Sequence, residues 1–452
     1  MSVLDKKNFF VFGMAKSGAA AALLLARKDY SVTVYDDDKE VLSVFMATPE
    51  TAGFENRIKA VDKSGASESV RRSDCLVLSP GIPLEHALVD TARKSSVEVI
   101  GELELAYQFC SSKVIGVTGT NGKSTVVNII GRILETAGKR AVVAGNVGTP
   151  FSSVVSDEDA FDIAVLEVSS FQLDTIVDFK SDIAVLLNVT PDHLDRYGDS
   201  FDEYVKSKAR ILNRSDAETV FVYNAGDNAC LSMAAGFEGR KIAFSSARSL
   251  EEGVCLEDDM IIREWSGRKE RVIQRSEFTP VGIHNAENAL AAVAAVTPFG
   301  IEKETIAEAL RSYHPLPHRM ELVRVAGGVA YINDSKATNV DAAVKSLRSI
   351  DGRVILIIGG RDKNGDFSML LPHLDHVVKV IVLGEAAAKI ESAIQGQRPV
   401  QHASSLEEAV LAAKETAEPG DTVLLAPACA SFDMFRDYTD RGDVFRASVG
   451  AL

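Results

Sequence analysis

The stretch Gly119-Thr120-Asn121-Gly122-Lys123-Ser124-Thr125 constrains the fold of this chain more than any other. The apolar run 114–117 before it predicts a buried strand, and residues 126–134 after it continue at helical spacing. Glycines between a strand and a helix let backbone N–H groups converge on an anion, which the helix dipole also favours. We therefore expect a bound nucleoside triphosphate, with Lys123 at its terminal phosphates and Ser124 or Thr125 holding Mg²⁺. The alternative is an ordinary turn that contains Gly-Lys-Ser.

The loop is shorter than the common phosphate loop. Val117 stands five positions before Gly122, where the longer loop of many ATPases has a glycine. The short form Gly-x-x-Gly-Lys-Ser-Thr therefore argues against a generic ATPase of that type.

Composition limits the class of protein. A chain of 452 residues with 46% hydrophobic and 25% charged residues has the length for about three globular domains. Its net charge of −15 argues against nucleic acid or an anionic membrane as the partner. Five scattered cysteines without a Cys-x-x-Cys pair predict reduced thiols in a cytoplasmic protein. We also expect a monomer.

Residues 1–101 predict a first nucleotide-binding domain. The strand 9–12, the turn 13–18 and a helix are followed by a second strand that ends in Asp36. This order is close to the dinucleotide-binding pattern, in which an acid at the end of the second strand meets a ribose. Ala15 replaces a glycine that such a loop needs, so an NAD-dependent dehydrogenase is the weaker reading and a nucleotide held in another way fits better.

Residues 102–315 predict the central ATP-binding domain. Glu167 lies inside an apolar strand, where a carboxylate needs an ion or a partner, so either Mg²⁺ or a buried salt bridge is expected. His193 follows the next strand. Its position predicts either a role in binding metal or substrate or a purely structural role. Asn285 and Asn288 lie three residues apart on one helical face, suited to a base or simply exposed.

Residues 316–452 predict a third α/β domain, in which strands alternate with helical segments and functional residues stand at the strands' carboxyl ends.

Within the central domain, the segment 241–278 predicts short alternating strands, a small antiparallel sheet beside the mainly parallel central one. The fold class is therefore α/β, with Rossmann-like domains flanking a central ATPase-type domain.

Several motifs follow one another along essentially the whole chain. They are the loop 119–125, Glu167-Val168-Ser169-Ser170-Phe171-Gln172, His193 with Asp195-Arg196-Tyr197, Lys208, His284-Asn285-x-x-Asn288, Pro317-His318-Arg319, Asp334-Ser335-Lys336-Ala337-Thr338-Asn339 and Pro427-Ala428-Cys429-Ala430-Ser431-Phe432-Asp433. Together, and in this order, they resemble the Mur ligases, the ATP-dependent amide-forming enzymes of peptidoglycan synthesis. The segments 334–339 and 427–433 are the discriminating parts of the resemblance, and 427–433 points to the members that add D-glutamate.

The resemblance implies a reaction. ATP would phosphorylate the L-alanine carboxylate of UDP-N-acetylmuramoyl-L-alanine to an acyl phosphate, and the amine of D-glutamate would attack it and release phosphate. Such a transfer depends on in-line positioning and charge neutralisation. Two Mg²⁺ ions are implied, with Ser124, Glu167, His193 and Lys208 as the metal-supporting residues, Lys208 being carbamylated in the family. An unmodified Lys208 in a salt bridge is the alternative.

The resemblance also assigns roles by position. Lys123, His193 and Lys208 would be catalytic. The ATP-binding residues would be Gly119, Thr120, Asn121, Gly122, Lys123, Ser124, Thr125, Asn285, Asn288, Arg319, Asp334 and Lys336. The UDP-substrate would meet Ser17, Asp36, Gly81, Asn146 and His193, and D-glutamate would meet Thr338, Lys363, Ser431 and Phe432. Because ATP residues come from two domains, we expect the third domain to close over the second.

Other functions remain to be distinguished. Another Mur or folylpolyglutamate-type ligase would take a different acceptor or amino acid. A dehydrogenase would leave the Lys123 loop unexplained, and a regulatory nucleotide-binding protein would not need Glu167, His193 and Lys208 together.

Overall fold

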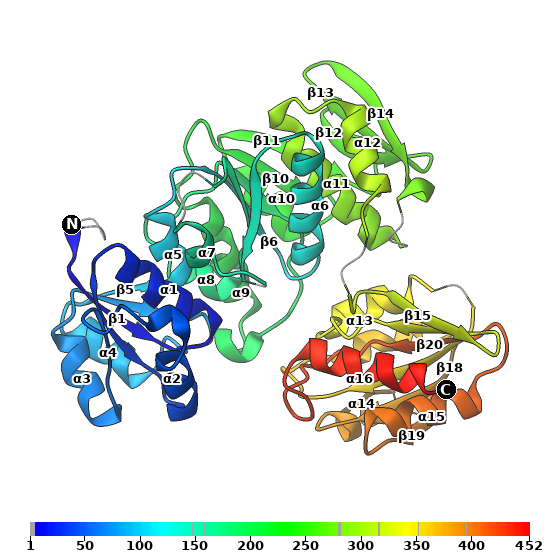
Figure 1. Ribbon diagram of the computed structural model, residues 1–452. Helices are drawn as coiled ribbons and strands as arrows, with labels where there is room; N and C mark the ends of the chain where they lie inside the picture. The colour runs from blue at the N-terminus through cyan, green and yellow to red at the C-terminus, as the bar shows by residue number, and fades with distance from the viewer. Residues whose placement is uncertain are drawn as a thin grey trace.

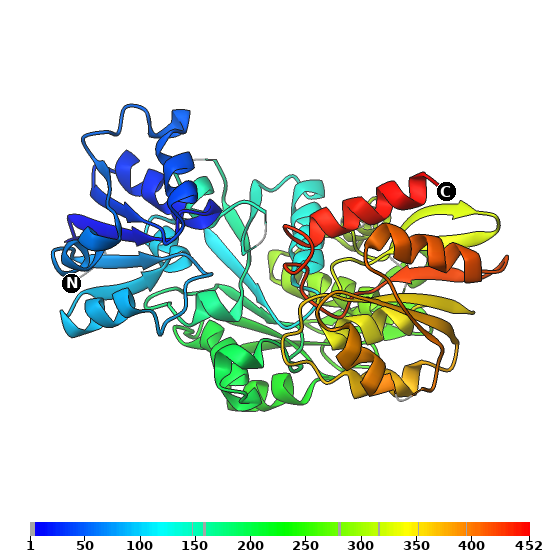
Figure 2. The same cartoon turned by 90° about the horizontal axis from the view of Figure 1, so that it is seen from below.

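Three separate sheets divide the chain into three α/β domains. The computed structural model describes residues 5–146, 148–156, 160–278, 282–314, 317–350, 352–394 and 396–452. Figure 1 shows the domains in chain order, from the blue first domain through the central one to the yellow and red third domain. Figure 2 shows the central domain between the other two. The predicted fold class is confirmed.

The first domain is a five-stranded parallel sheet in the order β3-β2-β1-β4-β5. Its central strands are continuous apolar runs because helices cover both faces of the sheet. The strands are β1 (Asn8–Phe12), β2 (Ser31–Tyr35), β3 (Ile58–Ala60), β4 (Cys75–Leu78) and β5 (Glu98–Gly101). The helices are α1 (Lys16–Arg27), α2 (Lys39–Met46), α3 (Lys63–Arg71) and α4 (Ala87–Lys94).

The central domain contains a nine-stranded sheet in the order β14-β13-β12-β11-β10-β9-β6-β8-β7. Its strands are β6 (Lys113–Thr118), β7 (Ala141–Gly145), β8 (Ile163–Glu167), β9 (Ile183–Leu186), β10 (Val220–Asn224), β11 (Arg240–Ser245), β12 (Gly253–Glu257), β13 (Met260–Trp265) and β14 (Arg268–Gln274). Its helices are α5 (Glu102–Tyr107), α6 (Lys123–Thr136), α7 (Phe151–Val154), α8 (Ser170–Leu173), α9 (Phe201–Ala209), α10 (Asn228–Gly236), α11 (Ile283–Val296) and α12 (Lys303–Arg311).

The segment 241–278, predicted as a small antiparallel sheet beside the central one, instead extends the central sheet, and its strands pair antiparallel only from β12 onward. β12 pairs parallel with β11, and β13 and β14 then pair antiparallel beyond it. At the other end of the sheet, β6 lies between β8 and β9 and runs parallel to both. The segments that follow these three strands therefore start from one edge of the sheet, where open α/β sheets bind ligands.

The third domain has a six-stranded sheet in the order β15-β16-β20-β17-β18-β19, parallel except for the edge strand β15. The strands are β15 (Glu321–Ala326), β16 (Val329–Asn333), β17 (Val354–Gly359), β18 (Val377–Leu383), β19 (Val400–His402) and β20 (Thr422–Leu425). The helices are α13 (Val340–Leu347), α14 (Ala387–Ile394), α15 (Leu406–Thr416) and α16 (Tyr438–Gly450). Short 3-10 helices lie at Pro49–Thr51, Leu194–Tyr197, Arg210–Leu212, Arg275–Glu277, Thr297–Phe299 and Phe367–His373.

Candidate active site

The phosphate loop needs glycine at two points. Gly119 and Gly122 have φ angles of +151° and +91°, which other residues rarely adopt. A Cβ on Gly122 would lie 2.3 Å from Oδ1 of Asn288, so α11 packs directly against the loop. The loop then turns into α6, which begins at Lys123. The predicted strand, turn and helix are thus in place, with the helix N-terminus available to an anion.

Two lysines converge on the same loop carbonyl. Lys123 Nζ donates to Gly119 O at 2.7 Å and to Thr120 O at 2.9 Å, and Lys208 Nζ donates to Gly119 O at 2.9 Å. Burial lowers the pKa of Lys123 and lowers that of Lys208 well below its usual range, and the positive charge of Lys123 lowers the pKa of Lys208 further. Lys208 is 1% exposed and its ammonium lies 4.5 Å from the Tyr204 ring centroid.

The buried carboxylate of Glu167 has no ion pair among the described residues. It is 3% exposed, and its Oε1 accepts from Asn146 Nδ2 at 3.2 Å. The salt bridge considered from the sequence is therefore not present in the part of the chain that the structure covers. A buried carboxylate left in this state suits a cation brought by a ligand.

His193 lies just beyond β9 in the left-handed conformation, with a φ angle of +54°. Its ring packs edge-on against Phe171, with centroids 4.9 Å apart. Burial lowers the pKa of His193 to about 4, so the ring is neutral at pH 7 and its nitrogen lone pair is free to act as a ligand.

The donor set fits Mg²⁺ bound together with phosphate. Within the described residues, no three His, Cys, Asp or Glu side chains gather as a complete metal cage. One carboxylate, one hydroxyl and one imidazole around a phosphate loop instead match the way Mg²⁺ keeps waters and shares phosphate oxygens. The predicted metal-supporting residues are Ser124, Glu167, His193 and Lys208.

A cleft opens between the central and third domains beside this loop. It brings together residues that are up to 225 positions apart in the chain, from the loop, α11 and the connector to the third domain. Of the predicted ATP-binding residues it is lined by Asn121, Gly122, Thr125, Asn285, Asn288, Arg319, Asp334 and Lys336. Gly119, Thr120, Lys123 and Ser124 belong to the adjoining loop and are not among the lining residues.

Arg319 is presented to the cleft by a strained connector. Its neighbours His318 and Met320 both have left-handed backbones, with φ angles of +62° and +46°. Each is fixed by residues that flank Ser335: Met320 N donates to Asp334 Oδ1 at 3.2 Å, and His318 O accepts from Lys336 N at 3.1 Å. The connector and the 334–336 turn therefore form one unit.

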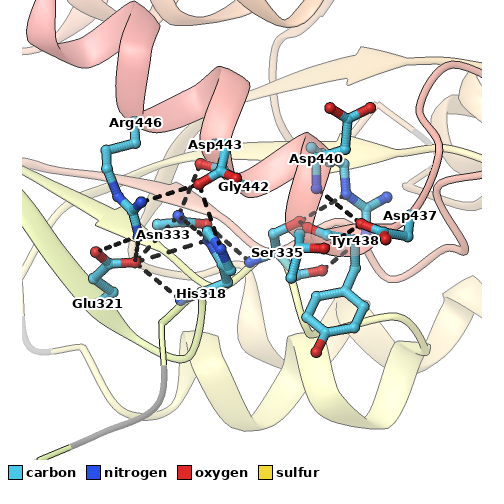
Figure 3. Close-up of polar contacts among 12 residues, drawn as sticks. His318, Glu321, Asn333, Ser335, Asp437, Tyr438, Asp440, Gly442, Asp443 and Arg446 are labelled. Atoms are coloured by element: carbon cyan, nitrogen blue, oxygen red, sulfur yellow. Dashed lines mark hydrogen bonds and ion pairs between the residues drawn. The ribbon is translucent and has the colours of Figure 1, made fainter. Parts of the chain in front are cut away.

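A polar network behind this unit ties it to α16 (Figure 3). Asn333 Nδ2 lies 3.0 Å from His318 Nδ1 and donates to Gly442 O at 3.1 Å. Glu321 accepts from His318 N at 2.9 Å and from Arg446 at 3.0 Å. Figure 3 also shows Ser335 beside Tyr438, whose carbonyl accepts from the Ser335 hydroxyl at 2.8 Å.

The two charged groups of the 334–336 turn are buried in different ways. Burial raises the pKa of Asp334, whose carboxylate accepts hydrogen bonds from Ser346 and Met320 N. Burial and then Arg319 lower the pKa of Lys336 to about 7. The Lys336 ammonium lies 3.9 Å from the Tyr438 ring centroid.

The central and third domains also touch through a buried carboxylate, Asp192. Its Oδ1 accepts from Lys363 Nζ and its Oδ2 from Asn339 Nδ2, each at 2.8 Å. Burial opposes ionisation of Asp192, but Lys363 and His193 outweigh it and bring its pKa to about 2. A predicted D-glutamate residue is thus anchored across the domain boundary, next to the predicted catalytic histidine.

The predicted D-glutamate residues are only partly brought together. Lys363 lines a cavity with Asp192 and Asn339, and Asn339 follows Thr338 in the chain. Ser431 is buried, whereas Phe432 is 63% exposed and lines none of the cavities described here. Tyr438, six residues further on, is the aromatic residue beside Lys336.

The predicted UDP-substrate residues lie around the first domain and its junction with the second. Asp36 accepts from Met14 N at 2.6 Å, which closes the 13–18 turn, and lines an open cavity of about 1110 Å³. Ser17, predicted within that turn, lies in the first turn of α1, because the helix already begins at Lys16. Gly81 is exposed between Pro80 and Ile82, whose carbonyls accept from Arg196 of the central domain. Asn146 lies at Glu167, as described above.

Family models match all three domains. The N-terminal model of the MurD-like Mur ligases matches residues 7–101, the Mur ligase middle domain matches 117–296, and the Mur ligase glutamate ligase domain matches 318–429. The chain is 41% identical over 99% of its length to a UDP-N-acetylmuramoylalanine–D-glutamate ligase of Pelotomaculum thermopropionicum, covering 98% of that protein. A ligase of the same name from Acidobacterium capsulatum is also 41% identical, with 99% and 96% of the two chains covered.

The chain belongs to the Mur ligase family. Solved structures share the fold of this Mur ligase at low identity. A pseudomurein peptide ligase type C from Methanothermus fervidus aligns with a TM-score of 0.64 at 20% identity, over 98% of this chain and 99% of its own. A UDP-N-acetylmuramate–alanine ligase from Thermotoga maritima aligns with a TM-score of 0.62 at 16% identity, over 99% of both chains.

Sequence reasoning missed several residues of this Mur ligase site. Asp192 was overlooked because an aspartate in a loop after a strand is ordinary until its partners from another domain are known. Lys345 lines the cleft, but a lysine on a helix face carries no signal of its own. Tyr438 could have been found from its place at the start of α16, just after the Ser431 motif.

Proposed function

We propose that this chain is an ATP-dependent ligase that joins D-glutamate to UDP-N-acetylmuramoyl-L-alanine, giving ADP and phosphate, in peptidoglycan precursor synthesis. The observation that carries the proposal is that Arg319 and Lys336 of the third domain line the cleft beside the phosphate loop, where Lys123 and Glu167 of the central domain lie close enough to influence the charge of Lys336. Full-length relatives that carry the name of this activity support the choice of substrates.

The reaction needs a carboxylate made reactive and an amine brought to it. ATP supplies the phosphoryl group that converts the L-alanine carboxylate into a good acyl donor. Lys123, Arg319 and Lys336 put positive charge where two anions must meet, which lowers the electrostatic barrier to their approach. His193 stays neutral at pH 7 and so adds a ligand without adding charge.

Two Mg²⁺ ions fit this arrangement. Ser124 and Glu167 would hold one beside the phosphate loop, and His193 with Lys208 would support the other. Bound Mg²⁺ supplies neutralisation of the phosphate oxygens and a template for their orientation.

Carbamylation of Lys208 is part of the proposal. Only a neutral amine adds carbon dioxide, and the environment of Lys208 favours the neutral form. No carboxylate forms an ion pair with Lys208 among the described residues, so the salt-bridge alternative has no support there. Carbon-13 NMR in ¹³C-bicarbonate should show a carbamate carbonyl signal that is absent in Lys208→Met. A signal that persists in that variant would reject the assignment.

The two substrates are assigned to residues of different domains. Ser17, Asp36, Gly81, Asn146 and His193 are assigned to the UDP-substrate. D-Glutamate is assigned to Thr338, Lys363 and Ser431, since a cation and hydroxyls suit a dicarboxylate. Phe432 is assigned to D-glutamate only through its backbone groups, because its side chain is exposed.

The test is phosphate release from ATP with UDP-N-acetylmuramoyl-L-alanine and a panel of amino acids that includes D- and L-glutamate. We expect release to require both the acceptor and D-glutamate. Lys123→Met should lower the rate by about 10² or more, as loss of one preorganised cation does, while the circular-dichroism spectrum stays unchanged. Release that is indifferent to D-glutamate, or a preference for another amino acid, would overturn the proposal in favour of a related ligase. We expect the active form to be a cytoplasmic monomer, which light scattering and cell fractionation would check.

Among the described residues, no helix combines the length and the apolar composition that crossing a bilayer requires.

A further inference from the structure

Asp341 joins the third domain to the phosphate loop itself. It stands in the first turn of α13, and its Oδ2 accepts from Asn121 Nδ2 at 2.6 Å. The same oxygen accepts from Thr190 Oγ1 at 3.2 Å. One carboxylate oxygen of the third domain therefore holds two residues of the central domain.

Both of those residues belong to the support of the phosphate loop. Asn121 is the third residue of the loop, and its backbone exchanges hydrogen bonds of 2.9 and 3.0 Å with the Asn188 side chain. Thr190 accepts from and donates to the hydroxyl of Thr120, at 3.0 Å in each case. A change in the position of the Asn121 or Thr190 side chain would therefore shift the backbone of the phosphate loop, whose N–H groups bind phosphate.

The charge of Asp341 is balanced within its own helix. Lys345, four residues along α13, donates to the same Oδ2 at 2.7 Å and lines the ATP cleft. With Lys345 in place, the carboxylate can lie next to a phosphate-binding loop without leaving uncompensated negative charge there. Hydrogen bonds to an ionised carboxylate are also stronger than neutral ones.

The simpler explanation is that Asp341 serves only its own helix. An acid in the first turn of a helix stabilises it through the helix dipole. Glu407 offers a matched comparison, because it holds the same second position in α15 of the same domain, is exposed, and makes no contact with the central domain among the described residues.

We propose that Asp341 is a positioning residue that couples docking of the third domain to the geometry of the phosphate loop, through its hydrogen bonds to Asn121 and Thr190. The inference rests on the proposed function, since it assigns the consequence to ATP and D-glutamate. In the undocked molecule the loop lacks this support. The loop takes its final position when the third domain docks, and the same docking brings Arg319, Lys336 and Lys363 to the site.

The experiment compares wild type with Asp341→Ala, Asp341→Asn and Glu407→Ala. The KM values for ATP, D-glutamate and the UDP-substrate are measured separately, along with kcat and Tm. ADP affinity is measured by calorimetry with Mg²⁺ in the absence of the other substrates. Lys345→Met is added because it removes the counter-charge but keeps the carboxylate.

We expect Asp341→Ala to raise the KM for ATP and D-glutamate about tenfold, since it removes two charge-assisted hydrogen bonds. ADP should bind correspondingly more weakly. The KM for the UDP-substrate should stay within about twofold of wild type, because that ligand is assigned to the first and central domains. Asp341→Asn should recover part of the loss, because an amide oxygen still accepts from Asn121. Glu407→Ala should match wild type in all these constants.

Two results would overturn the inference. The first is a wild-type ADP affinity and unchanged KM values in Asp341→Ala. The second is a fall in Tm together with an equal rise in KM for all three substrates, seen in both Asp341→Ala and Glu407→Ala. That pattern would mean that each acid only stabilises its own helix. Failure of the proposed function would look different, because wild type itself would then release no phosphate in a D-glutamate-dependent way.

Discussion

Lys336 shows how a residue can be suited to function at a cost to stability. Its ammonium is buried near Arg319, Lys123 and Lys363 and lies 3.9 Å from the Tyr438 ring centroid. Burial and these cations outweigh the attraction of Glu167 and lower its pKa to about 7. The surplus of positive charge is what a bound polyphosphate would balance, so the ligand-free protein bears an unfavourable interaction that binding removes.

We therefore expect Lys336→Met to be more stable and much less active. An unfolded lysine ionises near pH 10.4, so between about pH 7 and 10 the unfolded chain binds more protons than the folded one. The contribution of Lys336 to the free energy of unfolding therefore rises with pH between about pH 7 and 10, and it is lowest below pH 7. Urea unfolding should give Lys336→Met an advantage of about 1–3 kcal/mol at pH 6.5, shrinking by pH 9.5. An advantage that does not change with pH would contradict the stated cause.

At the scale of elements, helix α16 organises the loops that carry the predicted substrate residues. The buried guanidinium of Arg441 donates to Ser335 O at 2.8 Å and to Cys429 O at 3.2 Å, which holds the 334–336 and 429–431 segments together. One residue later, Gly442 leaves room for His318, the neighbour of Arg319. A single helix thus fixes both the segment proposed to bind ATP and the segment proposed to bind D-glutamate.

Gly442→Ala tests this arrangement. An added Cβ would lie 2.2 Å from His318 Nδ1, so either α16 or the connector must move. We expect the free energy of unfolding to fall by about 1–3 kcal/mol, as overpacking does, and the KM for ATP to rise because Arg319 is displaced. The matched control is Gly450→Ala at the end of the same helix, where a Cβ meets nothing within 4 Å and better helix propensity should leave stability equal or higher. Equal behaviour of the two variants in unfolding and KM would contradict this account.

At the scale of the whole molecule, the domains are joined in two different ways. Leu24 of the first domain belongs to the same buried cluster as Leu103 and Phe151, so the first two domains share apolar core. The clusters of the third domain contain only its own residues among those described. Polar contacts such as Asp192–Lys363 and Asn121–Asp341 join it to the central domain. Polar interdomain contacts are the kind that open and close.

We expect the third domain to move as a unit. Small-angle X-ray scattering should show a radius of gyration that falls when a non-hydrolysable ATP analogue and the UDP-substrate are added together, because bound anions complete the charge balance of the cleft. The same measurement on Lys363→Ala, which loses the partner of Asp192, should show weaker compaction. No change in wild type would count against domain closure.

The sequence by itself determined the fold class and the chemistry of the phosphate loop. Both depend on local patterns: apolar runs make strands, and the positive φ angles at Gly119 and Gly122 require glycine whatever surrounds them. It also indicated that Glu167 was unusual, because a carboxylate inside an apolar strand is costly in any fold.

Only the tertiary structure decided which side chains from different domains meet. Asp192, Asp341 and Tyr438 are ordinary residues in the sequence, and their partners Lys363, Asn121 and Lys336 lie up to 220 positions away. The motif 427–433 predicted that Phe432 binds D-glutamate, yet its side chain is exposed to solvent. The phosphate loop could be predicted as a place where an anion binds. The residues that complete it are contributed by a second domain, and their meeting depends on packing that no local spacing encodes.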